Sequence, residues 1–157
     1  MPLGLTLFNS KLIKNNKKKI FFGGTFSGNP LSTKVGLDTF TFVKRNKKKI
    51  DKHINYLSNL LENEINSYCK NKKINFKIQK FESIARPIFS SLEINNRFYR
   101  EKFDPNFKNS LKLKKYFLKK NIFISSNCCF FISFCHTEKD IYYLINVLKK
   151  ILSKNYF

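Results

Sequence analysis

The chain has 157 residues, of which 31 are Lys or Arg and 10 are Asp or Glu, so its formal net charge is +21. Hydrophobic residues make up 42% of the chain and Phe alone occupies 18 positions, which excludes a disordered tail. No apolar run approaches the ~20 residues of a membrane-spanning helix, so no membrane is expected as a partner. The start does not resemble a signal peptide, and we expect a cytoplasmic protein with four free cysteines.

The positive charge points first to nucleic acid, because basic proteins often bind it. The excess is nearly all Lys, with 27 Lys against 4 Arg, and it accompanies many Asn, Ile and Phe residues. These residues share A/T-rich codons, so a mutational bias of the genome explains them together. Nucleic-acid interfaces favour Arg, which makes bidentate contacts to bases and phosphates. We therefore interpret the Lys runs as solvated surface; they lie at 17–19, 47–49, 72–73, 114–115 and 119–120.

The first half of the chain predicts a loop followed by two helices. Residues 21–30 hold three of the five Gly, which is typical of a shaped loop. Asn29 followed by Pro30 is a helix start, with Asn as the N-cap and Pro at the first helical position. We expect one helix over 30–44 and a second over 51–69. The second has an apolar face formed by Ile54, Leu57, Leu61, Ile65 and Tyr68.

The second half predicts strands between helices. Residues 74–90 look extended, Asp104 and Pro105 open a helix to about residue 120, and 122–124 and 129–132 read as strands around a turn. Thr137 and Asp140 form a capping box ahead of a last helix over 141–152. This order predicts an α+β or α/β fold in which helices cover a small sheet.

The segment Gly23–Pro30 is the sharpest local motif. Its small residues, hydroxyl groups and backbone N–H groups ahead of a helix suit an anion, above all a phosphate. It closely resembles the corresponding segment of class III aminotransferases, the pyridoxal-phosphate (PLP) enzymes that include glutamate-1-semialdehyde 2,1-aminomutase. Segments 81–89, 96–100 and 132–141 resemble later parts of the same family in order and spacing.

The resemblance also implies which part of the family is present. Residues 1–4 resemble the end of a glycine-rich stretch that follows the Schiff-base lysine, so the chain is expected to be a C-terminal fragment beginning just after that lysine. The implied fold is the α+β small domain of a fold-type I PLP enzyme, an α/β family. The expected parts are a large-domain remnant (1–28), a connector helix (29–44) and the small C-terminal domain (45–157).

By this resemblance, Thr25 and the backbone N–H of Gly24 would bind the PLP phosphate of a neighbouring subunit. Arg86 would meet a substrate carboxylate, although a structural ion pair is an equal alternative. His136 is interpreted as structural, and His53 as exposed on the polar side of its helix. The four Cys contain no C-x-x-C pair, so we expect no zinc site, and no catalytic residue is assigned.

The implied activity is amino-group transfer by a PLP-dependent aminotransferase or aminomutase, on a small amino-acid or amino-sugar-type substrate. The chain alone is expected to be inactive, because the lysine and most of the large domain are missing. Its expected partner is a second copy or an N-terminal half, whereas nucleic acid is not expected. The alternative from another class is a basic protein that binds RNA or another polyanion, or a decayed remnant of the enzyme.

Overall fold

The structure is a computed structural model that describes residues 4, 11, 23–24, 27–90, 92, 94, 96, 98–99, 102, 107–125 and 128–154. The chain divides into two compact units, residues 1–47 and 48–157. Among the described residues, no helix is long and apolar enough to cross a membrane. The Lys runs within these ranges are exposed except for Lys114, which is half-buried.

The long helix α2 spans Pro30–Lys72 without a break. The prediction of two separate helices was therefore wrong. Residues 45–50 contain no Gly or Pro and three Lys, a good helix former, so nothing there interrupts the backbone hydrogen bonds. The predicted apolar face of the second half is confirmed, since Leu57, Leu61 and Ile65 are fully buried.

Three short strands form an antiparallel sheet in the order β1-β2-β3. They are β1 (Lys77–Phe81), β2 (Ile84–Ile88) and β3 (Phe130–Phe131). The extended structure expected over 74–90 is thus confirmed. Residues 122–124 are not a strand, contrary to the prediction. Their alternation is real, with Ile124 buried and Phe123 82% exposed, but alternation reports which side chains face the core and not whether the backbone joins a sheet.

The outer edge of β1 is closed by side chains from α2. The Asn66 side chain accepts a hydrogen bond from the Ile78 backbone N–H at 2.7 Å and donates one to the Ile78 carbonyl at 2.9 Å. The Glu62 carboxylate accepts from the Lys80 backbone N–H at 3.1 Å. These contacts replace the bonds that a fourth strand would make, so this edge is protected from pairing with another chain.

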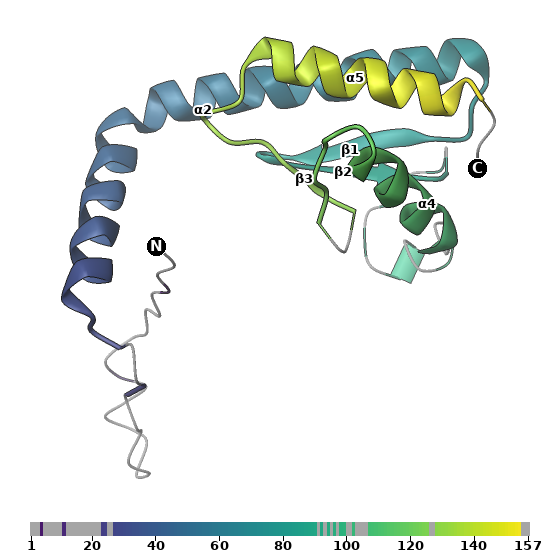
Figure 1. Cartoon of the computed structure of the whole chain (residues 1–157). Coiled ribbons are helices and arrows are strands. Elements are labelled where there is room, and N and C mark those ends of the chain that lie inside the picture. The colour runs from purple at the N-terminus through teal and green to yellow at the C-terminus, as the bar shows by residue number, and fades with distance from the viewer. Residues whose placement is uncertain are drawn as a thin grey trace. The chain divides into compact units, whose positions relative to one another are not determined.

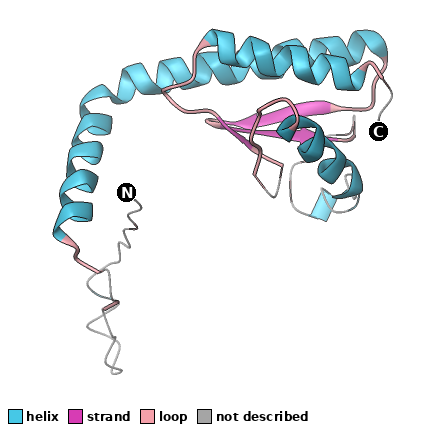
Figure 2. Cartoon of the chain, in the orientation of Figure 1, coloured by secondary structure: helices cyan, strands magenta, loops and turns pink. Residues whose placement is uncertain are grey.

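Two further helices complete the second unit, α4 (Phe107–Leu118) and α5 (Glu138–Leu152). Figure 1 shows α5 running alongside the second half of α2, with the sheet beneath them, and Figure 2 shows the strands at the centre of this unit. Lys149 of α5 forms an ion pair with Glu64 of α2 at 2.7 Å. Phe117 of α4 lies edge-on to Phe130 of β3, with ring centroids 5.5 Å apart. The helices and the sheet therefore share one hydrophobic core.

The predicted capping box at the start of α5 is confirmed. Thr137 donates its backbone N–H and its hydroxyl to the Asp140 carboxylate, both at 2.8 Å, and its Oγ1 accepts from the Asp140 backbone N–H at 3.4 Å. The hydrogen bonds from the Thr137 backbone and hydroxyl hold the pKa of Asp140 below its usual range. The carboxylate is therefore the form that caps the helix.

We expect the stability from this cap to be present above the unfolded pKa of Asp140, near about pH 4, and to disappear as the pH falls through the lower folded value. Asp140→Asn should remove this part of the pH dependence, because the amide does not titrate. The check is urea unfolding of both chains between pH 7 and pH 2.5, followed by circular dichroism. An identical loss of stability with acid in both chains would contradict the assignment.

Candidate functional site

The glycine-rich loop before α2 folds into a tight turn. The Gly24 carbonyl accepts a hydrogen bond from the Ser27 backbone N–H at 2.9 Å, and Gly28 has a positive φ of 70°. A Cβ at position 24 would come within 3.1 Å of Ser27 Oγ, which is tighter than ordinary contact. Gly24 is exposed, and its own N–H has no partner among the described residues.

The predicted cap of α2 is confirmed. Asn29 Oδ1 accepts from the Ser32 backbone N–H at 3.0 Å, and the Asn29 carbonyl accepts from the Thr33 N–H at 2.9 Å. Pro30 has no N–H, so of the first three helical residues only Leu31 keeps a donor without a partner among the described residues. An anion at this place would rely on the loop more than on the helix end. Thr25, the other predicted phosphate ligand, lies outside the described residues.

Arg86 lies in the second unit, on β2, and is half-buried. It stands opposite Gln79 of β1, while its neighbour Pro87 stands opposite Ile78. The Asn66 side chain forms hydrogen bonds with both the N–H and the carbonyl of Ile78, so Ile78 and Pro87 are a non-hydrogen-bonded pair of the ladder. On the other side of β2, β3 pairs only with Ile84 and Ala85. Pro87 thus costs the sheet no hydrogen bond, which explains how a proline sits beside Arg86 in a strand.

His53 of α2 contacts the turn before α5, and His136 is part of that turn. His136 Nδ1 accepts from the Ser133 backbone N–H at 2.9 Å, and the His136 carbonyl accepts from His53 Nε2 at 2.8 Å. The His53 ring also meets Phe134 edge-on, with centroids 5.5 Å apart. His53 is therefore half-buried, and the prediction of an exposed side chain was wrong, because residues 133–136 fold back over this part of α2. The structural role predicted for His136 agrees with these bonds.

The cysteines have different surroundings. Cys69, Cys128 and Cys129 are buried and Cys135 is exposed, all as free thiols. Burial raises the pKa of Cys69 to about 11. Burial also raises the pKa of Cys128, although a side-chain hydrogen bond with Ser110 and the positive charges of Lys114 and Arg86 act to lower it. Among the described residues, no group of three or more His, Cys, Asp or Glu side chains is placed to hold a metal ion.

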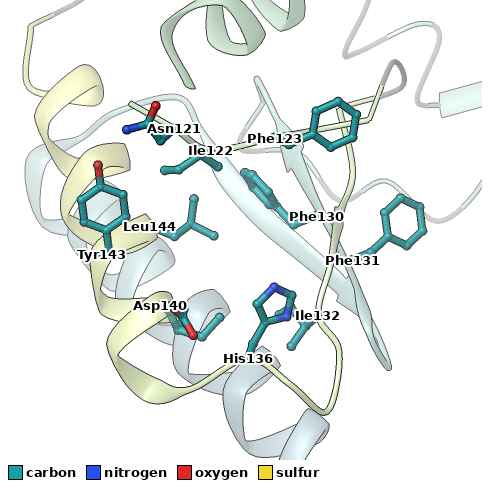
Figure 3. Close-up of a pocket in the computed structure, with 11 residues that line it drawn as sticks. Asn121, Ile122, Phe123, Phe130, Phe131, Ile132, His136, Asp140, Tyr143 and Leu144 are labelled. Atoms are coloured by element: carbon teal, nitrogen blue, oxygen red, sulfur yellow. The ribbon is translucent and has the colours of Figure 1, made fainter. Parts of the chain in front are cut away.

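A cavity of about 450 Å³ lies between α5, residues 121–123 and β3. Figure 3 shows Phe130 and Leu144 around its centre, with Ile132, His136 and Asp140 at its lower end. This cavity has no local signature in the sequence, because its walls come from three separate segments. Phe123 and Phe131, which are 82% and 58% exposed, also line it.

Curated relatives match most of this chain. It is 30% identical over 141 residues to the glutamate-1-semialdehyde 2,1-aminomutase of Methanosphaera stadtmanae, covering 88% of the chain and 32% of that protein. It is also 30% identical over 141 residues to the aminomutase of Thermosipho melanesiensis, covering 87% of the chain and 31% of that protein. The chain thus spans about a third of the length of these relatives. No protein-family model matches.

The fold of the chain resembles that of solved enzymes of this kind. A glutamate-1-semialdehyde aminomutase of Pseudomonas aeruginosa, solved in complex with PMP, superposes with a TM-score of 0.74 at 17% identity, covering 88% of this chain and 31% of that one. The predicted resemblance to the aminomutase-like class III aminotransferases is confirmed. The described helices and sheet have the fold of part of a fold-type I PLP aminotransferase, as predicted.

Proposed function

We propose that the chain is part of a PLP-dependent enzyme that transfers amino groups, of the glutamate-1-semialdehyde aminomutase kind. The observation that carries this proposal is the 30% identity over 141 residues to two aminomutases. Because the chain spans about a third of those proteins, we propose that it acts only with a polypeptide that supplies the Schiff-base lysine and the contacts to the PLP ring. The chain alone would then be inactive.

The glycine-rich turn fits the phosphate of PLP. The exposed Gly24 N–H has no partner among the described residues, and a Cβ at that position would come within 3.1 Å of Ser27 Oγ. We propose that this N–H and the Thr25 hydroxyl donate hydrogen bonds to the phosphate oxygens across a subunit boundary. When bound, PLP supplies the electron sink that amino-group transfer requires. The residues of this chain would bind the phosphate group and so hold the cofactor in position.

Arg86 is proposed to orient the substrate. Arg86 is half-buried on β2, and a guanidinium group can bind a carboxylate through two parallel hydrogen bonds. The proposed substrate is therefore a small amino-acid-like molecule that carries a carboxylate. Arg86→Lys should weaken substrate binding while leaving PLP retention unchanged.

The first unit also supports the need for a partner. Leu31, Phe40 and Phe42 on the first half of α2 are 61%, 64% and 50% exposed. Exposed apolar patches of this kind favour association. We propose that a second copy or an N-terminal half covers this helix, so the isolated chain should be oligomeric or poorly soluble.

The test is co-expression with the matching N-terminal half. We expect the pair to be soluble and to retain PLP, seen as cofactor absorbance that survives gel filtration. Thr25→Ala in the pair should weaken PLP binding by about 1–3 kcal/mol, the value of a lost charge-assisted hydrogen bond.

Thr33→Ala is the matched control, because Thr33 is an exposed threonine of the first turn of α2. It should leave PLP retention unchanged. Equal retention in Thr25→Ala and the parent pair would contradict the phosphate contact. A chain that binds PLP covalently at one of its own lysines and transfers amino groups unaided would overturn the assignment of the missing lysine.

A further inference from the structure

The cavity between α5, residues 121–123 and β3 is not part of the proposed cofactor grip, which lies in the first unit. At one end it has two polar atoms that the fold leaves available. His136 Nδ1 accepts from the Ser133 N–H, so the proton of the neutral ring is on Nε2, which has no partner within the described ranges. The Thr137 bonds to the Asp140 carboxylate both use Oδ2, which leaves Oδ1 open to a donor.

The rest of the cavity is apolar and aromatic. Its lining includes buried side chains, among them Phe130 and Ile132, which are 6% and 5% exposed. Phe123 and Phe131 line its rim and are 82% and 58% exposed (Figure 3). Rings left this open on a folded surface are typical of sites that stack against a flat partner.

The arrangement selects a class of ligand. The apolar floor and the phenyl rims favour a flat ring system, and a volume near 450 Å³ lies within the range of small-molecule pockets. His136 Nε2–H requires an acceptor, and Asp140 Oδ1 requires a donor. We propose that this cavity binds a small planar heteroaromatic molecule that presents a hydrogen-bond donor beside an acceptor, the acceptor to His136 and the donor to Asp140.

The proposal is tested with adenine as the probe, because it is flat and has an amino donor next to ring-nitrogen acceptors. For a ligand of this size the expected Kd is on the order of 1 mM. Ligand-detected NMR at micromolar concentration of the full chain should show saturable binding. 9-Methylpurine has no N–H donor, whereas 9-methyladenine keeps the exocyclic amine, so 9-methylpurine should bind at least about threefold more weakly than 9-methyladenine because the bond to Asp140 is missing.

Three variants distinguish binding in the cavity from nonspecific binding to exposed hydrophobic side chains. Phe131→Ala should weaken adenine binding by about fivefold or more. His136→Asn keeps an acceptor for the Ser133 N–H but removes Nε2–H, so it should also weaken adenine binding. Phe81→Ala is the matched control, since Phe81 is 77% exposed on β1 and does not line the cavity. Absence of saturable binding, or binding that Phe131→Ala and His136→Asn leave unchanged, overturns the proposal.

Discussion

Asn66→Leu is expected to destabilise the second unit by about 2–4 kcal/mol, although the new side chain has similar volume. In the parent chain the Asn66 amide satisfies both the N–H and the carbonyl of Ile78, a residue only 1% exposed. Leucine would leave two buried backbone groups without a hydrogen bond. It would also open the outer edge of β1, so the variant should aggregate more readily on partial unfolding.

The measurement is urea unfolding followed by circular dichroism, with light scattering to detect aggregation. Asn63→Leu is the control, because Asn63 lies one turn earlier on α2 and is exposed. It should change stability by no more than about 0.5 kcal/mol. Similar midpoints for the two variants would show that the Asn66 contacts do not hold the sheet edge.

Phe117→Ala should cost about 3–5 kcal/mol, a large part of the stability of a domain of this size. Phe117 is fully buried and lies edge-on to Phe130, so it joins α4 to β3. Removing the ring leaves a cavity and takes away the aromatic contact. Because Phe130 also forms part of the proposed ligand cavity, this variant should lose adenine binding as it loses structure.

Leu118→Ala is the comparison for this second substitution. Leu118 is the next residue of α4 and is 50% exposed, so its truncation should cost less than about 1 kcal/mol. Thermal unfolding distinguishes the two, since Phe117→Ala should lower Tm by more than about 10 °C. Equal effects would mean that α4 does not pack on the sheet through Phe117.

Several features followed from the sequence because their causes are local. Asn29 and Pro30 start a helix, and Thr137 with Asp140 caps another, through bonds between residues three or four positions apart. The spacing of Leu57, Leu61 and Ile65 fixed which face of α2 is buried. The Gly23–Pro30 motif and the later segments also indicated the aminotransferase family, and the relatives confirm that resemblance.

Other features depend on residues far apart in the chain, and local patterns do not encode them. The exposure of His53 is set by the turn at 133–136, and the protection of β1 is set by Asn66, twelve residues before Ile78. Whether 122–124 joins the sheet depends on whether its backbone pairs with a strand elsewhere in the chain, and the strand pairs of this sheet join only β1 to β2 and β2 to β3 among the described residues. Local sequence therefore accounts for the capped starts of two helices, the buried face of α2 and the resemblance to the aminotransferases. The strand partners, the closed sheet edge and the cavity could not be predicted in this way, because each needs contacts between distant segments.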